Sequence, residues 1–172
     1  MKKILFAMSV LSFVFSTTTA NALLIEPFIG YQMGDYESGS TKEDAAGIEY
    51  GARLGASFTM FDFGVEYATG TLEVDFSPSV DYDTTDLGAF IAVNFPILLR
   101  AYFTYFVKSE AEPDTGGELE GSGYRLGVGF TGLPFVSLNL EMINRSYDEF
   151  NGSSVTDRDI QTTMLSVSLP LP

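Results

Sequence analysis

The sequence contains no cysteine, no histidine and no tryptophan. Disulfide bonds are therefore excluded, and so are Ser-His-Asp and Cys-His catalytic sites, because these depend on the missing residues. Basic residues are scarce too: nine Lys and Arg stand against 23 Asp and Glu, which gives a formal charge of −14. This charge excludes nucleic-acid binding, because phosphates require basic surfaces. We expect neither a cofactor nor an enzymatic activity.

Long hydrophobic runs are missing from the chain beyond its first segment. Lys2 and Lys3 precede an apolar stretch over residues 4–15, which is short for a membrane-spanning helix. Ala20 and Ala22 then provide a small-x-small cleavage site. This order predicts a secretory signal peptide over residues 1–22, Sec-type export, and a mature chain of residues 23–172. The alternative is a buried N-terminal helix.

Helical periodicity is weak after the first segment, whereas alternation of apolar and polar residues appears repeatedly. This alternation predicts eight strands, over residues 24–34, 47–58, 61–74, 84–95, 98–109, 122–130, 134–147 and 159–169. Turns of two or three residues follow the second, fourth and sixth strands, and the other connections are long, polar and acidic. Such asymmetric connections and an even strand number predict an all-β fold, an eight-stranded antiparallel up-and-down transmembrane β-barrel with short periplasmic turns and long acidic extracellular loops.

The two faces of these strands carry different residues. In the second predicted strand one face holds Ile48, Tyr50 and Leu54, and the other holds Glu49 and Arg53 between glycines. An eight-stranded barrel has an interior only wide enough for side chains, so large apolar residues would overfill it. We therefore predict that the charged face looks into the lumen and the apolar face looks at lipid. A soluble barrel of the lipocalin kind, with the faces reversed, is the alternative.

Charges of both signs occur on the predicted lumen face. Buried charges are tolerated when they are paired and hydrogen-bonded, and the planar fork of arginine suits pairing with carboxylates. We therefore predict a charge network that plugs the lumen, made of Glu26, Glu49, Arg53, Glu66, Arg100, Arg125, Glu141 and Arg145. The alternative is a narrow or gated channel for ions or small solutes, which opens when pairs exchange partners.

Most other acidic residues fall in or beside the long predicted loops, which we interpret as a solvated, self-repelling rim. A second interpretation is weak divalent-cation binding, because hard cations prefer clustered carboxylates. The candidate ligands are Asp81, Asp83 and Asp86 in one loop, and Glu110, Glu112, Asp114, Glu118 and Glu120 in the next. Neither cluster has the spacing of an EF-hand, so no metal site is assigned.

The same loops are the expected place of contact with an extracellular ligand or a host surface. Tyr36, Tyr82 and Phe150 lie in or beside them and are the candidate contacts for adhesion, on the expectation that they are exposed. Direct contact of the acidic loops with lipopolysaccharide phosphates would be repulsive, so divalent ions would have to bridge the two.

Residues 23–172 resemble the small eight-stranded outer-membrane barrels, the group of the OmpA transmembrane domain, OmpX and opacity-like surface proteins. The resemblance rests on the signal, eight alternating strands, asymmetric connections and charged lumen. It implies a monomeric integral protein of the bacterial outer membrane, in contact with lipid and lipopolysaccharide, with a structural or surface-adhesive role. Unlike full-length OmpA-type proteins, the sequence is expected to have no C-terminal periplasmic domain. One departure is the terminal sequence "MLSVSLPLP", where such barrels usually end in an aromatic residue. Either another terminal signal is tolerated, or the eighth strand stops near Leu169.

Overall fold

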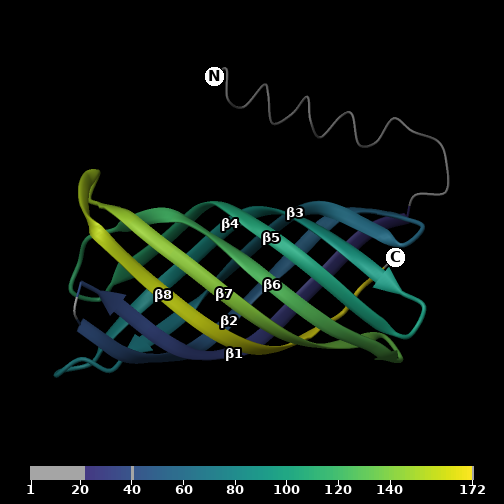
Figure 1. The fold of residues 1–172 in the computed structure, drawn as a ribbon, viewed down its shortest axis with the longest axis horizontal. Coiled ribbons are helices and arrows are strands. Elements are labelled where there is room, and N and C mark those ends of the chain that lie inside the picture. The colour runs from purple at the N-terminus through teal and green to yellow at the C-terminus, as the bar shows by residue number, and fades with distance from the viewer. Residues whose placement is uncertain (1–21, 40, 172) are drawn as a thin grey trace, which may run out of the picture.

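The protein forms one closed β-barrel (Figure 1). The structure is a computed structural model that describes residues 22–39 and 41–171, with the backbone alone at residues 156 and 157. Its strands are β1 (Ala22–Ser38), β2 (Thr41–Phe58), β3 (Phe61–Val74), β4 (Val80–Phe95), β5 (Leu99–Pro113), β6 (Leu119–Leu133), β7 (Val136–Phe150) and β8 (Ser153–Ser168). The predicted signal peptide falls almost entirely outside the described residues and stays a prediction.

Each strand pairs antiparallel with its neighbour in the chain, and β8 pairs with β1 to close the sheet. The start of β1 and the end of β8 therefore lie at the same end of the barrel, which we call the termini end (Figure 1). The prediction of an all-β, eight-stranded antiparallel up-and-down barrel is confirmed. No helix among the described residues is long and apolar enough to cross a membrane.

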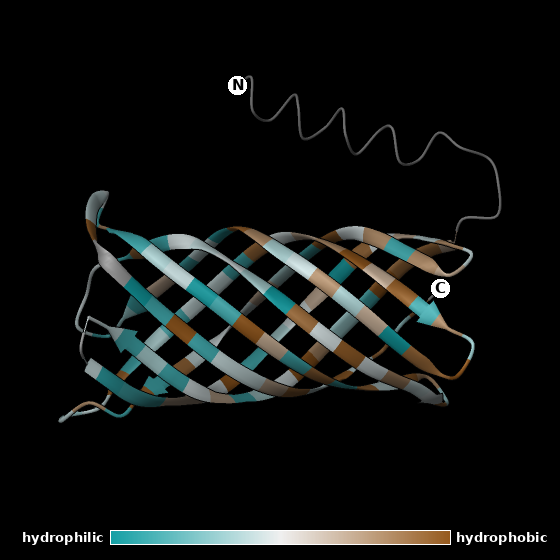
Figure 2. Ribbon diagram, in the orientation of Figure 1, coloured by the Kyte–Doolittle hydropathy of each residue, from teal (hydrophilic) through white to brown (hydrophobic). Residues whose placement is uncertain are grey.

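Hydrophobic residues are common on the strands from the termini end to beyond the middle of the barrel (Figure 2). Large apolar side chains are exposed on the outside of the barrel. They are between 37% and 64% exposed, and a continuous exposed apolar surface of this extent indicates contact with lipid. We call this surface the apolar belt. It consists of Leu23, Ile25, Ile29, Tyr31, Met33, Ile48, Tyr50, Leu54, Phe58, Phe61, Phe63, Val65, Tyr67, Leu87, Ile91, Phe95, Leu99, Phe103, Tyr105, Val107, Tyr124, Leu126, Val128, Phe130, Leu138, Leu140, Met142, Leu165, Val167 and Leu169.

The prediction of long loops is wrong. The predicted loop segments continue the strands as paired hairpins. β1 and β2 stay in register out to Ser38 and Thr41, and β7 and β8 stay paired out to Phe150 and Ser153 with one register shift between Tyr147 and Glu149. The strands contain 14 to 18 residues, whereas a tilted strand crosses a bilayer with about 9–11. The surplus forms a wall that projects beyond the apolar belt at the end opposite the termini, which we call the extension.

Alternation persists in the extension, but its polarity is reversed. On β3, Glu66 points inward and Tyr67 outward within the belt, whereas farther along the same strand Leu72 points inward and Glu73 outward. The reversal follows from the surroundings, because lipid favours apolar residues outside and water favours polar ones. The extension is therefore built like a soluble barrel, and this explains why its polar residues look like loops in the sequence.

The inward residues of the extension form an apolar cluster that we call the apolar plug. It consists of Tyr36, Ala45, Leu72, Val74, Tyr82, Ala111, Leu119, Tyr147 and Ile160, with Phe76, Val80 and Phe150 packed against it. The rings of Tyr36 and Tyr82 stack with their centroids 6.0 Å apart. The expectation that these two tyrosines are exposed is wrong, since they are 3% and 5% exposed, and Phe150 is half-buried.

At the termini end, β8 ends at Ser168, and the following residues still pair with β1. Leu169 donates its N–H to the carbonyl of Pro27, and Ile25 and Leu171 exchange two backbone hydrogen bonds. The eighth strand therefore stops near Leu169, which is one of the two possibilities given for the terminal sequence.

Candidate functional site in the barrel lumen

Within the apolar belt the lumen holds charged residues beside two small clusters of buried apolar side chains. Six carboxylates and four guanidinium groups are at most 4% exposed: Glu26, Glu49, Asp62, Glu66, Asp86, Glu141, Arg53, Arg100, Arg125 and Arg145. All eight residues of the predicted network are among them, and two acids, Asp62 and Asp86, join them. We call these ten residues the lumen network. With every group ionised it carries two negative charges in excess.

Arg53 on β2 stands at the centre of the network. Its Nε donates to Glu66 Oε2 at 2.7 Å, and its Nη1 lies 3.4 Å from Glu26 Oε1. Its Nη2 lies 3.5 Å from Glu141 Oε2, so one guanidinium faces carboxylates from three other strands. Register explains the first contact, because Arg53 and Glu66 are direct partners across β2 and β3.

Arg125 on β6 joins the same acids to the other half of the network. Its Nη1 donates to Glu141 Oε2 at 2.9 Å, and its Nε lies 3.2 Å from Glu66 Oε1. Its Nη2 donates to Glu49. Arg53 and Arg125 thus share two carboxylates, and this sharing makes the network continuous along the lumen.

Toward the extension, Arg145 holds the next group of residues. Its Nη2 bonds Glu49 and also Asp86 Oδ2, the latter at 2.7 Å, and its Nε donates to Asp86 Oδ2 at 2.9 Å. Ser109 donates to the other oxygen of Asp86 at 2.6 Å. Gln32 accepts from Arg145 at 3.2 Å. This half of the network reaches the base of the apolar plug, because Ser109 also lies 3.4 Å from the hydroxyl of Tyr147.

Toward the termini end, Arg100 closes the lumen. Its Nη1 donates to Glu26 Oε2, and its Nη2 lies 3.3 Å from Asp62 Oδ2. Asn94 donates to Asp62 at 2.8 Å, and Ser168 donates to the other oxygen of Glu26 at 2.7 Å. Ion pairs and hydrogen bonds therefore run from the termini end of the lumen to the apolar plug.

Aromatic rings fill the space between the guanidinium groups. The ring of Tyr102 lies 4.2 Å from the guanidinium carbon of Arg53 and 5.6 Å from that of Arg100. Phe28 lies between Arg53 and Arg125, at 4.6 and 5.1 Å. Glycine makes room for these rings: a Cβ at Gly127 would come within 2.1 Å of the Tyr102 ring.

In this arrangement the charged side chains of the lumen bind one another. Asp62 and Glu66 are two acids of β3 that could in principle act as a pair of catalytic carboxylates. Each is bound by other side chains: Asp62 accepts from Asn94, and Glu66 accepts from Arg53 and Thr104. A few buried polar atoms, including Gln32 Nε2, have no hydrogen-bond partner in the protein. The geometry suits a packed, charge-paired interior.

The structure separates the first candidate cation cluster. Asp81 and Asp83 point outward from β4, whereas Asp86 points into the lumen and binds Arg145. The hypothesis that these three acids share a cation is therefore wrong. It fails because strand alternation continues through Asp81, Asp83 and Asp86 on β4.

The second cluster does not converge on a common point either. Glu110 pairs with Lys108, and this hydrogen bond lowers the pKa of Glu110. Glu118 lies beside Glu110, and the hydrogen bond between them raises the pKa of Glu118. In the described part of the chain no group of three or more acidic side chains is placed to hold a metal ion, and weak cation binding by this second cluster stays a prediction.

Sequence reasoning missed three parts of the interior: Asp86, the hydroxyls that complete the network, and the apolar plug. Asp86 could have been found from the sequence, because it lies two residues from both Thr84 and Gly88 and so points to the lumen side of β4 with them. Alternation places Thr104 and Ser166 on the lumen face, but residue type gives no sign that their hydroxyls bind the network, because serine and threonine occur on both faces of these strands. Ser109 follows a register shift in β5, so alternation does not place it.

No protein-family model and no curated protein matches this sequence. Solved structures do match its fold. Neisserial surface protein A (NspA) is 16% identical, with a TM-score of 0.58 over 89% of this chain and 100% of its own. Ail, the attachment invasion locus protein of Yersinia pestis, is 14% identical, with a TM-score of 0.61 over 87% of this chain and 99% of its own. The chain thus has the fold of the small outer-membrane β-barrels.

Proposed function

We propose that the protein is an integral barrel of the bacterial outer membrane with a closed lumen, whose extension stands outside the cell and serves surface interaction or envelope integrity. The apolar belt supports the membrane location, because lipid is the solvent in which such a surface is stable. The two similar structures support it at the level of fold. We propose no catalytic role, since the buried acids are bound by arginines and hydroxyls.

The filled lumen is the observation that carries this proposal. Ion pairs occupy it from Arg100 at the termini end to Arg145, and the apolar plug follows in the extension. An ion would have to separate charge pairs in a low-dielectric interior, which is costly, and then pass an apolar constriction. A gated channel remains the competing function, and a conductance measurement separates the two.

The extension supports the surface role. The wall of the extension consists of hydrogen-bonded strands, so its side chains project from fixed backbone positions. All described acids outside the lumen lie on it, with Lys42, Lys108 and Arg158 as its basic residues. Ail was solved in complex with a heparin analogue, sucrose octasulfate. This chain's acidic wall would repel such a polyanion, and we therefore propose a partner of opposite charge.

Single cysteines test the proposed orientation, because the protein has none of its own. Ser154→Cys places a thiol on the extension, and Met60→Cys places one in the turn between β2 and β3 at the termini end; both positions are exposed. Each variant is produced in the outer membrane of intact cells and treated with a membrane-impermeant maleimide.

We expect labelling of the Ser154→Cys variant on intact cells and labelling of the Met60→Cys variant only after lysis. A heat-dependent shift in gel mobility shows that each variant is folded. Labelling of Met60→Cys on intact cells, with Ser154→Cys protected, would overturn the orientation and with it the surface role.

A further inference from the structure

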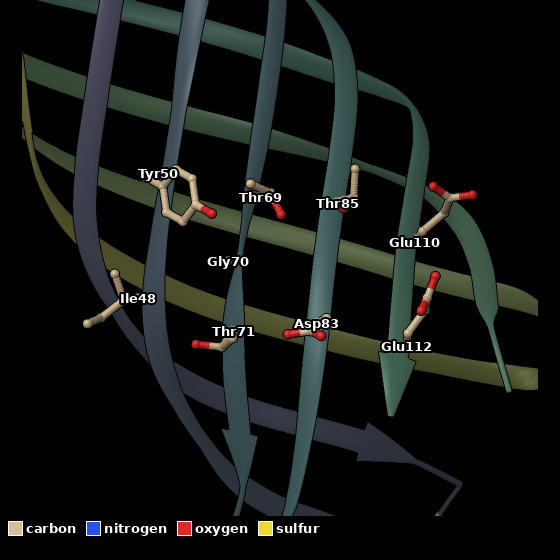
Figure 3. A pocket seen from close by; sticks show the side chains of 9 residues that line it. All are labelled: Ile48, Tyr50, Thr69, Gly70, Thr71, Asp83, Thr85, Glu110 and Glu112. Carbon is tan, nitrogen blue, oxygen red and sulfur yellow. The ribbon is translucent and has the colours of Figure 1, made fainter. Parts of the chain in front are cut away.

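A groove crosses the outer face of β2, β3, β4 and β5 where the apolar belt meets the extension (Figure 3). Two adjacent rows of residues, each in direct register across the four strands, line it. The first row is Ile48, Thr71, Asp83 and Glu112, and the second is Tyr50, Thr69, Thr85 and Glu110. The groove has a volume of about 580 Å³, which lies within the range of small-ligand sites, about 300–1,000 Å³.

The side-chain lengths in these rows create the groove. Ile48 and Tyr50 stand at one side and Glu110 and Glu112 at the other, while three threonines and Asp83 occupy the middle (Figure 3). The groove therefore has an apolar wall on β2, an acidic wall on β5 and a floor of hydroxyl groups. A ligand that satisfies all three surfaces must combine an apolar part, a positive charge and hydrogen-bonding groups.

The groove straddles the edge of the apolar belt, because Ile48 and Tyr50 belong to the belt and the other lining residues do not. The next outward residues toward the termini end are Tyr67 and Leu87, which belong to the belt. Toward the tip, a second hollow of about 420 Å³ continues from it and adds Glu73 and Asp81. One end of the groove thus opens to the edge of the lipid, and the other opens to water between carboxylates.

The charge of the groove is negative and poorly compensated. Among the described residues only Glu110 of its lining acids has an ion-pair partner, Lys108; Asp83 and Glu112 have none. Lipid phosphates at this height would be repelled. A small polyamine would satisfy the acids but leave the apolar wall uncovered.

We propose that this groove binds a basic peptide segment with an aromatic anchor residue. The anchor packs against Ile48 and Tyr50, lysine or arginine side chains face Asp83 and Glu112, and the hydroxyls of the floor meet the peptide backbone. The inference deepens the proposed surface role and rests on the extension lying outside the cell.

The probe is a short synthetic peptide with one tryptophan between two lysines. Because the protein contains no tryptophan, the emission of the peptide reports binding directly. The protein is held in nanodiscs of phosphatidylcholine, which carries no net charge. We expect a saturable blue shift of the tryptophan emission that weakens with added salt.

Two variants and their matched controls test the groove. Thr71→Phe fills the floor without changing charge, and Thr163→Phe adds the same bulk on the outer face of β8. The double variant Asp83→Asn/Glu112→Gln removes two groove acids, and Asp148→Asn/Glu149→Gln removes two exposed acids from β7. We expect each groove variant to weaken binding about tenfold and each control to change it less than about twofold.

Three results would overturn the inference: no saturable binding by the wild-type protein, unchanged binding to Thr71→Phe, or equal losses in the two charge variants. Displacement of the peptide by spermine at equal concentration would also overturn it, because charge alone would then account for binding. The cysteine labelling is an independent experiment. If it shows that the extension lies outside the cell and the peptide does not bind, this inference is refuted and the proposed function is unaffected.

Discussion

Arg53→Met should destabilise the barrel strongly, because it removes the positive charge on which the centre of the lumen depends. The substitution keeps a long side chain in place and leaves Glu66, Glu26 and Glu141 without one of their partners. Breaking a fully buried pair by removing one partner costs about 3–5 kcal/mol. Each carboxylate keeps a second partner, which argues for the lower part of that range. The lost contacts with Phe28 and Tyr102 argue for the upper part.

The free energy of unfolding is measured by urea titration in lipid vesicles, with tyrosine fluorescence and circular dichroism as signals. Arg158→Met is the matched control: Arg158 is only partly buried and lies 5.6 Å from the Phe150 ring, so its loss should cost less than about 1 kcal/mol. Adding Glu66→Gln to Arg53→Met should recover part of the loss, since the double variant no longer strands that carboxylate. Equal, small losses for Arg53→Met and Arg158→Met would refute the reasoning.

Three further predictions concern packing and pH, and each is measured as a change in the urea midpoint. Gly127→Ala should cost about 1–3 kcal/mol, because the added methyl overlaps the Tyr102 ring, which arginines hold in place; an unchanged midpoint would contradict this packing. Leu72→Ala should cost about 2–5 kcal/mol, since Leu72 is fully buried in the apolar plug, and a loss well below 1 kcal/mol would mean that the plug is loose. Burial, assisted by Tyr36, raises the pKa of Tyr82 to about 12. The stability that Tyr82 contributes is complete below the ordinary tyrosine pKa of about 10 and is lost as pH rises toward 12. The variant Tyr82→Phe should therefore show a smaller fall in the urea midpoint between pH 10 and pH 12 than the wild-type protein. An identical pH profile for the two proteins would contradict this prediction.

Alternation in the sequence was sufficient to predict the barrel, its strand order and the sense of its faces. It also placed the charged positions of the lumen, because an eight-stranded interior admits few large residues. The predicted strands ended too early for one physical reason. Apolar residues point outward and polar residues inward only where lipid surrounds the barrel, and this order is reversed in the extension. On β8, Val167 and Leu165 point outward, whereas Ile160 points inward beside an outward Asp159. A search for the point where polarity reverses would have located the edge of the belt from sequence.

Pairing within the lumen could not be predicted in the same way. Arg145 binds Asp86 and Gln32, which lie 59 and 113 residues away in sequence. The long arginine side chains reach across the lumen to strands that are not their neighbours, and those contacts depend on the stagger of the closed sheet. Residue type identifies the members of such a network, and three-dimensional geometry assigns their partners.

The filled lumen is the central claim, and single-channel conductance tests it most directly. The refolded mature protein is inserted in a planar bilayer, with folding shown by a heat-dependent shift in gel mobility. The account predicts a silent bilayer, because Arg53, Arg125 and Arg145 keep the interior paired and the apolar plug closes the extension. Stable, reproducible conductance steps from the folded protein would contradict it and favour the channel.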